Sequence, residues 1–417
     1  MNVVILNTSE KIGGAAIAAN RIMIALNKSG INAKMIVRDK QTNDSNVISI
    51  NSSDSKKYIN LPRFYWERFI IFINNKFNKN NLFKVSIANT GYKISHLKEI
   101  EQADIIHLHW INQGFISLKE IKCLIESGKP IVWTMHDMWP CTGICHHAYK
   151  CDKYTNECGK CFFLNSGKSN DLSQKIWQKK KLSSFADITV VTVSSWLKNR
   201  VKKSSLMGMS EVTVIPNVID TNTFRPYNKK EALTKLNLPE NKKIILMGAA
   251  RLDDDIKGGF YLQNALQFFS QRKDILLVLF GEIKNKKSFI NHLPIDYIHL
   301  GSINDTSKIA KLYSAADVTI CSSLYETFGQ TISESMACGC PVVSFNNGGQ
   351  TDIIDHMVNG YLAKSEDIED LAKGIEWILN NTDSEQLSIK AREKVITNYN
   401  EDVIAKQYIR LYESLLN

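Results

Sequence analysis

The sequence contains no apolar run that approaches the roughly 20 residues that a membrane-spanning helix needs. Its N-terminus, MNVVILN, begins directly with a strand pattern and lacks the basic and then apolar layout of a signal peptide. It also has no arginine-rich tract, no RNA-binding signature and no low-complexity segment. These absences lead us to expect a cytoplasmic protein that binds no nucleic acid.

The composition is that of an ordinary globular protein. The chain has 417 residues, of which 44% are hydrophobic and 23% are charged. This length exceeds one typical core and suits two domains of roughly 150–220 residues each. The formal net charge is +10, with lysines distributed along the whole chain. A solvated basic surface and an attraction to anionic lipid or phosphate-bearing ligands both remain open.

Short β-branched runs alternate with helical patterns along the chain. We expect strands at residues 2–6, 33–37, 104–109, 130–136, 188–194 and 212–217, and then at 243–249, 275–281, 298–301, 318–323 and 341–345. Near-continuous apolar strands separated by helices are typical of parallel sheets covered on both faces. Two such series in succession predict an α/β protein with two doubly wound domains.

The polar stretch 220–230, in which Pro226 breaks regular structure, is the natural domain boundary. We expect a first domain at 1–222 and a second at 223–396, followed by a C-terminal helix at 397–417 that could pack back on the first domain. Ligands of open α/β sheets bind beyond the carboxyl ends of the strands. The residues that follow each strand are therefore the candidates for a site.

One such segment, ETFGQTISESMACGCPVV, begins at Glu326. Gly329 permits a tight turn, and a helix that begins near Gln330 would present free N–H groups and the positive end of its dipole, which suit a diphosphate. Glu326 would then point toward the group on the outer phosphate, and Glu334 could accept hydrogen bonds from a vicinal diol such as a ribose. Two lone glutamates could equally be a surface carboxylate and a complement to the helix dipole.

The same segment resembles the signature of glycosyltransferase family 4, which comprises retaining, nucleotide-sugar-dependent transferases. The resemblance is a Glu, seven residues and a second Glu, with Phe-Gly inside and Ala-Cys-Gly-x-Pro-Val-Val following. It implies the GT-B fold, in which two Rossmann-like domains face each other across a cleft. It also implies that Glu326 contacts the donor sugar, that Glu334 binds the ribose, and that amides near Phe328, Gly329 and Thr331 hold the diphosphate.

The segment GAARLDDDIKGG, residues 248–259, follows the first strand of the second domain. By the resemblance, Arg251 and Lys257 lie where the family's paired cations neutralise the diphosphate. They would stabilise the charge on the leaving nucleotide as a divalent metal does in other transferases, so no catalytic metal is expected. In isolation, both would more often be solvated surface residues.

The first domain carries further positions that match the family. Gly13 and Gly14 lie in a segment that resembles its N-terminal glycine loop, although G-x-G-x-x-G is absent and a tight βα turn is the alternative. His136 matches the histidine that approaches the reacting sugar from the acceptor side, and His109 matches a residue of the cleft. His107 could line the cleft or belong to the core. Asn217 is expected near the cleft. Ile303 is expected at the nucleotide base, which could be uracil or guanine.

Six of the nine cysteines fall between residues 123 and 161. Their spacing is that of metal ligands, and a cytosolic chain seldom keeps disulfides. We expect a structural zinc on Cys145, Cys151, Cys158 and Cys161 within a cysteine-rich insertion at 141–161, with free thiols or a redox pair as the alternative. Similar insertions occur in a bacterial exopolysaccharide (colanic-acid-type) branch of the family. Cys321, Cys338 and Cys340 are expected in the core.

The aromatic and basic stretch 61–84 could lie on a membrane surface, although core or interdomain packing is favoured slightly. The resemblance implies transfer of a hexose from a UDP- or GDP-linked sugar to a glycan or lipid-linked acceptor in bacterial surface polysaccharide synthesis. The enzyme would act in the cytoplasm or peripherally at the inner face of the membrane. The alternatives are a nucleotide-sugar epimerase or phosphorylase on the same fold and a non-catalytic partner subunit.

Overall fold

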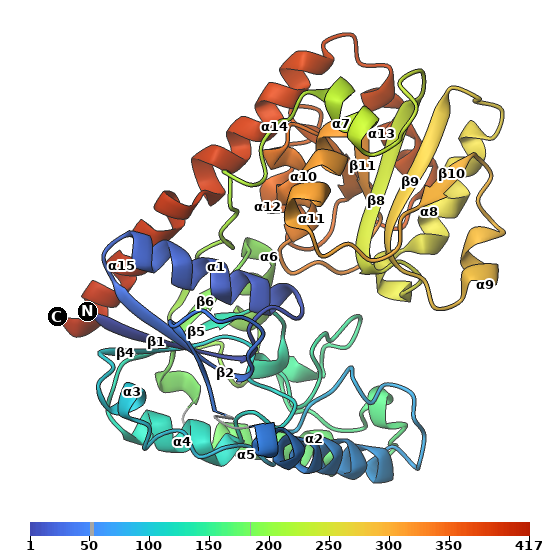
Figure 1. Ribbon diagram of the computed structural model, residues 1–417. Coiled ribbons are helices and arrows are strands. Elements are labelled where there is room, and N and C mark those ends of the chain that lie inside the picture. The colour runs from blue at the N-terminus through green and yellow to red at the C-terminus, as the bar shows by residue number, and fades with distance from the viewer. Residues whose placement is uncertain (51–53, 184) are drawn as a thin grey trace. The chain divides into compact units, whose positions relative to one another are not determined.

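The computed structural model describes residues 1–50, 54–183 and 185–417, without the side chains of residues 54–60, 186 and 288. The described chain divides into two units (Figure 1). Unit 1 comprises Met1–Pro216 together with Ile404–Asn417, and unit 2 comprises Asn217–Val403. The division therefore falls at 216 and 403, where the sequence suggested 222 and 396.

Unit 1 is built on a seven-stranded sheet in which every pairing is parallel. Its strands, in spatial order, are β3 (Val47–Ser49), β2 (Asn32–Asp39), β1 (Asn2–Ser9), β4 (Ile105–Leu108), β5 (Ile131–Met135), β6 (Thr189–Thr192) and β7 (Val212–Val214). Every residue of β4 and β5 is buried, as a parallel strand covered on both faces requires. Figure 1 shows α1 over one face of this sheet and α3 and α4 over the other.

The helices of unit 1 connect these strands. They are α1 (Gly14–Lys28), α2 (Asp54–Asn74), α3 (Lys98–Glu101), α4 (Leu118–Glu126), α5 (Leu172–Lys181) and α6 (Ser195–Lys202), with short 3-10 turns η1 (Trp139–Cys141), η2 (Lys153–Thr155), η3 (Phe162–Leu164) and η4 (Phe185–Asp187). Side-chain N-caps begin several of them: Ser117 accepts from the amide of Glu120 at α4, and Ser194 accepts from the amide of Leu197 at α6.

Unit 2 is built on a second parallel sheet of six strands. In spatial order they are β10 (Tyr297–His299), β9 (Ile275–Glu282), β8 (Lys243–Arg251), β11 (Val318–Cys321), β12 (Val342–Phe345) and β13 (Gly360–Ala363). Its helices are α7 (Lys229–Lys235), α8 (Gly259–Leu266), α9 (Lys286–Ile290), α10 (Thr306–Ala315), α11 (Gln330–Ala337), α12 (Gln350–Ile353), α13 (Ile368–Leu379) and α14 (Ser384–Tyr399), with 3-10 turns η5 (Asp255–Lys257) and η6 (Gln267–Phe269).

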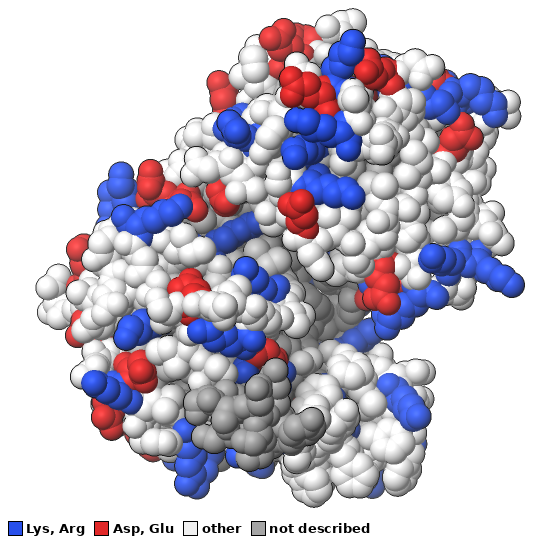
Figure 2. Space-filling model, in the orientation of Figure 1, with Lys and Arg blue, Asp and Glu red and all other residues white. Residues whose placement is uncertain are grey.

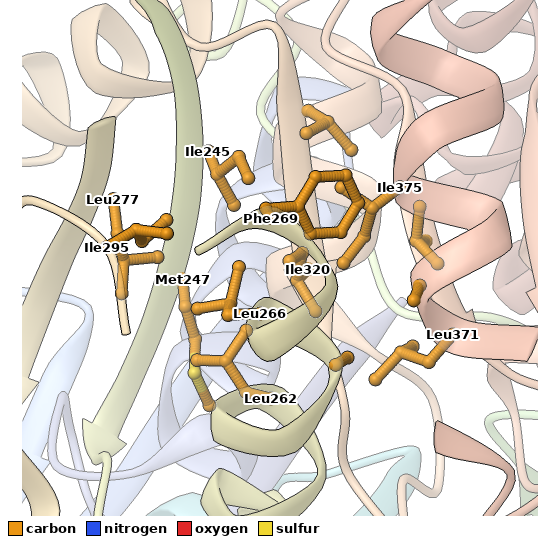
Figure 3. Close-up of a cluster of buried hydrophobic side chains, with 14 of the residues drawn as sticks. Ile245, Met247, Leu262, Leu266, Phe269, Leu277, Ile295, Ile320, Leu371 and Ile375 are labelled. Atoms are coloured by element: carbon orange, nitrogen blue, oxygen red, sulfur yellow. The ribbon is translucent and has the colours of Figure 1, made fainter. Parts of the chain in front are cut away.

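The core of unit 2 lies between its sheet and the helices α8 and α13. Figure 3 shows Met247 of β8 beside Leu262 and Leu266 of α8, with Phe269 and Ile375 filling the centre of the cluster. These side chains are 4% exposed or less. Removing so much apolar surface from water is the main term that holds the sheet and its helices together.

The last helix, α15 (Glu401–Leu416), returns the chain to unit 1. The hydroxyl of Tyr412 lies 2.7 Å from Nδ1 of His107, and the hydroxyl of Tyr408 lies 2.9 Å from Oγ1 of Thr134. All four side chains are fully buried. The helix is thus joined to β4 and β5 by buried polar contacts as well as by its aromatic rings.

The expected alternation of strands and helices is confirmed for both sheets. The sequence missed β3 and β13. It extended seven of the eleven expected strands by one to three residues at one or both ends, and it ended β1, β2, β8 and β9 too early. Cys321, Cys338 and Cys340 are buried as expected. Within the ranges that the structure describes, no helix is both long enough and apolar enough to cross a membrane.

Candidate active site

The order of the strands in unit 2 indicates where a ligand would bind. The chain moves from β8 outward to β9 and β10, and then returns to the other side of β8 with β11. Ligands of such sheets bind at this switch point, beyond the carboxyl ends of the two central strands. Of the predicted residues, Arg251 is the last residue of β8, and the loops that follow β8 and β11 contain Lys257 and Glu326.

Lys257 and Glu326 meet at this switch point. The Lys257 Nζ donates to Oε1 of Glu326 over 2.6 Å, and the two side chains are 32% and 16% exposed. Burial pushes the pKa of Lys257 downward, but the Glu326 carboxylate outweighs it and leaves that pKa above its usual value. The lysine therefore stays charged at neutral pH and remains accessible to an anion.

The loop after β8 is held against the end of β11 by close backbone contacts. Gly258 has φ +67°, and a Cβ there would lie 1.9 Å from the carbonyl oxygen of Ser322. The Ser322 hydroxyl donates to the carbonyl of Lys257 over 3.0 Å, and the amide of Leu324 donates to the carbonyl of Ile256 over 2.8 Å. Only glycine permits this approach, which fixes where the side chain of Lys257 starts.

A second pair of glycines positions Glu326. The amide of Gly349 donates to the carbonyl of Glu326 over 2.7 Å, and a Cβ on Gly349 would lie 2.3 Å from the carbonyl oxygen of Thr327. Gly348 has φ +74° and lies equally close to the backbone of Glu326. These glycines were not among the predicted residues, although a glycine pair shortly after a strand is a signal for close backbone approach.

Helix α11 begins beside these loops without a side-chain cap. Its N-cap is Gly329, with φ +111°, and its first turn contains no acidic residue. The Phe328 side chain is buried and its ring contacts Tyr399 edge-on at 5.6 Å, while Thr331 is half-buried. The amides of an uncapped first turn, together with the positive end of the helix dipole, suit an anion.

Glu334 lies one turn further along α11. It is half-buried, and its charge acts on Tyr313, whose pKa is raised by burial first and by this carboxylate second. Glu326 and Glu334 thus stand on the loop before α11 and on the helix itself. The predicted start of the helix near Gln330 is confirmed, and the roles of the two carboxylates stay predictions.

Arg251 was expected to bind phosphate, and in the structure it also contacts two carboxylates. Its Nε lies 3.4 Å from Oδ1 of Asp253, and one terminal nitrogen lies 3.3 Å from Oδ2 of Asp254. The side chain is still 39% exposed. Two carboxylates of its own loop therefore share its charge, which the sequence analysis did not anticipate.

Two other predicted residues of unit 2 lie in loops. Ile303 is half-buried after β10, near the end of the sheet where His299 Nε2 lies 2.8 Å from the carbonyl oxygen of Gly281. Asn217 is 3% exposed, and its carboxamide oxygen has no hydrogen-bond partner among the described residues. Their roles stay predictions.

In unit 1, His109 and His136 lie together beyond β4 and β5. Nδ1 of His109 lies 2.8 Å from Nε2 of His136, and the two rings are stacked at 5.1 Å. Burial lowers the pKa of His136 to about 4, and it lowers that of His109 well below its usual value. Both imidazoles are therefore neutral at pH 7, with His136 the more accessible of the two.

His107 belongs to the core. Its two ring nitrogens lie 2.7 Å from Thr134 Oγ1 and 2.7 Å from the hydroxyl of Tyr412, and burial lowers its pKa to about 3. The alternatives of cleft and core, which the sequence left open for this residue, are resolved in favour of the core.

Asp137 is a polar centre that the sequence analysis did not select. Its carboxylate accepts from the indole of Trp110 over 2.8 Å and lies 2.7 Å from Nδ1 of His146. Burial raises the pKa of Asp137, but the contacts with His146 outweigh it and lower that pKa to about 2. This carboxylate ties the cysteine-rich segment to the strand end that carries His136.

Gly13 and Gly14 are exposed at the start of α1, directly after β1. Gly13 is the N-cap, with φ +92°, and a Cβ there would meet nothing within 4 Å. The left-handed backbone explains a glycine at this position. The open space beside it is compatible with a ligand at the N-terminus of α1, and this role stays a prediction.

The four cysteines expected to hold zinc line one small pocket, together with mainly apolar neighbours. Burial raises the pKa of Cys158 and of Cys161 to about 11. Across the described chain, however, no three His, Cys, Asp or Glu side chains are arranged to hold a metal ion. This geometry gives zinc no support, and the assignment of Cys145, Cys151, Cys158 and Cys161 as ligands stays a prediction.

Two family models together cover most of the chain. Residues 12–223 match the model described as "Glycosyltransferase Family 4", and residues 228–399 match that described as "Glycosyl transferases group 1". An uncharacterised glycosyltransferase of Methanocaldococcus jannaschii, MJ1607, is 30% identical over 357 residues, which are 79% of this chain and 89% of the relative.

Solved structures that align over nearly the whole chain extend the comparison. The sucrose-phosphate synthase of Thermosynechococcus elongatus aligns with a TM-score of 0.67 at 20% identity, over 100% of this chain and 99% of that one. Anabaena HepE, solved in complex with UDP-glucose, aligns with a TM-score of 0.63 at 16% identity, over 99% and 100%.

The two parallel sheets and these neighbours define the class: the protein is a glycosyltransferase with the GT-B fold. More narrowly, the chain belongs to glycosyltransferase family 4. The resemblance read from the segment at Glu326–Val343 is thereby confirmed at the level of the family, whereas the cysteine-rich branch stays a prediction.

Proposed function

We propose that the protein transfers a hexose, with retention of configuration, from a nucleotide-diphosphate sugar held by unit 2. The observation that carries the proposal is the Lys257–Glu326 pair, 2.6 Å apart at the switch point of the second sheet and next to the uncapped start of α11. A cation, a carboxylate and a row of backbone amides meet there, which together suit a diphosphate joined to a sugar.

Each group of this site has a proposed part. An ammonium carries three N–H donors, so Lys257 can keep its bond to Glu326 and still donate to phosphate oxygens. The second carboxylate oxygen of Glu326 would accept from a hydroxyl of the donor sugar. The amides at Phe328, Gly329 and Thr331 would hold the diphosphate, and Glu334 would accept from the ribose.

Arg251 would complete the neutralisation of the diphosphate. Its contacts with Asp253 and Asp254 are longer than 3 Å, so a phosphate can replace them without breaking a short hydrogen bond. As the bond between the sugar and the diphosphate breaks, charge builds on the leaving phosphate. Arg251 and Lys257 would stabilise that charge, and this is the main electrostatic contribution that we assign to the chain.

Retention would follow if the acceptor hydroxyl attacks the donor sugar on the same face from which the diphosphate leaves. In this scheme the departing phosphate helps to take the proton of the incoming hydroxyl, and the protein supplies position rather than a covalent nucleophile. On the acceptor side we assign His136, which is neutral at pH 7 and so can both donate and accept a hydrogen bond. Gly13 and Gly14, His109 and Asn217 would line the space for the two substrates.

We assign the acceptor to a glycan or a lipid-linked saccharide of a bacterial surface polysaccharide, with the enzyme working from the cytoplasm. The family membership and the basic character of the chain support this assignment. The solved HepE complex contains UDP-glucose, which supports a UDP-linked donor, and the relatives also include a GDP-mannose-dependent mannosyltransferase of Corynebacterium glutamicum. Ile303, expected at the base, would contact either base.

A binding experiment tests the donor site directly. We expect one of the UDP- or GDP-linked sugars to raise the thermal midpoint, by mass action on the native state. Lys257→Met should abolish this shift. Lys242→Met is the matched control, because Lys242 forms an ion pair of 2.7 Å with Asp296 away from the switch point. An unchanged midpoint with every donor, or an equal loss in the control, would contradict the proposal.

A further inference from the structure

Helix α2 of unit 1 presents apolar side chains to solvent. Leu61, Tyr65, Phe69 and Ile73 are spaced four residues apart, so they follow one face of the helix, and all are exposed. Trp66 widens this face, and Phe77 and Phe83 continue it beyond the helix. We call these seven residues the aromatic face. Core or interdomain packing was favoured slightly for the stretch 61–84; the exposure of these seven side chains rules out core packing for them, and interdomain packing is not tested.

The opposite face of α2 is buried and contains two charged residues. Glu67 is 0% exposed, and its Oε1 accepts from the amides of Ile87 and Ala88 at 2.7 and 3.0 Å. Arg68 pairs with Glu67 at 2.9 Å and donates to the carbonyl of Val85 at 3.0 Å. Rotating the helix to hide its aromatic face would break these buried contacts, at the cost of unsatisfied charge. The exposure of the aromatic face is therefore fixed by the structure of unit 1.

The charge around the aromatic face has one sign. Between Asp54 and Glu99 the sequence contains a single acidic residue, the buried Glu67. Lys76, Lys79 and Lys84 are exposed among the aromatic residues. Figure 2 shows white surface with blue and no red at its lower right, where Figure 1 places the end of α2.

We propose that the aromatic face docks on a membrane surface that contains anionic phospholipid. Tyr, Trp and Phe rings suit the boundary between head groups and acyl chains, and lysines beside them suit anionic head groups. A second copy of the chain fits less well, because it would bring the lysines of two copies together. The proposal does not depend on the donor site, because membrane docking requires no turnover.

Vesicle flotation of the full chain tests the proposal. We compare vesicles of phosphatidylcholine alone with vesicles that also contain phosphatidylglycerol. We expect the chain to float with the anionic vesicles, and to be released as the salt concentration rises. Trp66→Ser with Phe69→Ser should weaken this binding at least tenfold. Phe268→Ser is the matched control, because Phe268 is 62% exposed on unit 2, outside the aromatic face.

Charge reversal measures the contribution of the lysines to vesicle binding separately from that of the aromatic rings. Lys76→Glu with Lys79→Glu should weaken binding to the anionic vesicles and leave the far-ultraviolet circular dichroism unchanged. Lys230→Glu with Lys235→Glu, both exposed on α7, is the control and should bind as the parent does. Equal binding to neutral vesicles would overturn the proposal.

Two further outcomes would also overturn it. If Trp66→Ser with Phe69→Ser lowers the thermal midpoint by more than the Phe268 control does and binds vesicles normally, the face packs within the chain. If that variant changes the oligomeric state in sedimentation and vesicle binding is unaffected, the face joins two copies. Binding that falls in both the ring and the lysine variants, with the fold unchanged, supports the membrane surface.

Discussion

Lys257 and Glu326 place opposite charges 2.6 Å apart on two partly solvated loops. A single, partly solvated pair of this kind contributes little to folding, about 0–1 kcal/mol. Its proposed importance lies in orientation, because each side chain holds the other where a diphosphate and a sugar would meet. Loss of the pair should therefore impair turnover far more than stability.

We expect Lys257→Met and Glu326→Gln each to lower turnover by about 10²–10³-fold, which is the usual effect of removing one preorganised electrostatic contact. Because the two act as a unit, the double variant should lose little more than the poorer single variant. The rate of nucleoside diphosphate release at saturating donor measures the turnover of each variant. Losses that multiply in the double variant would show that the two side chains act separately.

Gly258 offers a test of the close approach between the two loops. Gly258→Ala adds a Cβ 1.9 Å from the Ser322 carbonyl oxygen and should lower both the affinity for donor and the free energy of unfolding, the latter by about 1–3 kcal/mol. Gly128→Ala is the control, because Gly128 has φ +73° with nothing within 4 Å. Gly128→Ala measures the cost of a Cβ on a left-handed backbone alone, and the further loss in Gly258→Ala measures the cost of the contact with Ser322. Equal losses in the two variants would show that the contact has no effect.

Some candidate site residues could be predicted from the sequence and others could not. Glu326, Glu334 and Lys257 were predicted because motif spacing places them in the segments that follow β8 and β11. The contacts of Arg251 with its own loop were not found, since they depend on how residues 251–254 turn. Likewise, Gly348 was missed because its role is defined by the backbone of Glu326, which is distant in sequence.

At the level of elements, eleven of the thirteen strands that the structure describes were predicted from the sequence. The two that were missed, β3 and β13, are edge strands and only partly buried, so neither carries the near-continuous apolar run of a central strand. The buried face of helix α2 could not be predicted for a different reason: the charged Glu67 and Arg68 are buried, whereas large apolar side chains such as Tyr65, Trp66 and Phe69 are exposed. A pattern of this kind gives the wrong face when hydrophobicity alone decides which side is buried.

The burial of the cysteine-rich segment predicts the reactivity of its thiols. Burial raises the pKa of Cys158 and Cys161 to about 11, so at pH 7.5 both thiols should be protonated and react more slowly with iodoacetamide than the thiols of the unfolded chain. Mass spectrometry of the native protein reads the alkylation and the metal content together. One equivalent of zinc that is lost in Cys158→Ser would contradict the free-thiol description and favour the zinc prediction.

For the whole molecule, the buried histidines of unit 1 predict sensitivity to acid. Burial holds the pKa of His107 at about 3 and that of His136 at about 4, against 6.5 when unfolded. The unfolded chain therefore binds more protons between pH 6.5 and 4, and stability present at pH 7 is lost across that window. At pH 5 the loss should be about 2 kcal/mol for each histidine.

Urea unfolding at pH 7 and at pH 5 measures this loss. Six of the seven tryptophans lie in unit 1, so tryptophan fluorescence reports mainly on that unit. His107→Gln removes one titrating group and should reduce the dependence on pH, although it lowers stability at pH 7. The lowered pKa of Asp137, about 2, acts only at more acidic pH. Equal stability at the two pH values would contradict the assignment of neutral buried imidazoles.

Unit 1 should also depend on the end of the chain. Residues 1–216 alone lack Tyr408 and Tyr412, which contact Thr134 and His107. We expect this fragment to be less stable than unit 1 in the full chain, and a peptide of residues 404–417 to stabilise it. The same peptide with Tyr412→Ala should stabilise it less, as thermal denaturation would show. A fragment as stable alone as with the peptide would contradict this.

The return of α15 to unit 1 has a consequence for biosynthesis. A ribosome completes residues 217–403, and with them all of unit 2, before it delivers Tyr408 and Tyr412. Until then His107 and Thr134 lack the hydroxyl groups that they contact in the folded chain. Unit 1, although most of it is translated first, therefore completes its structure last.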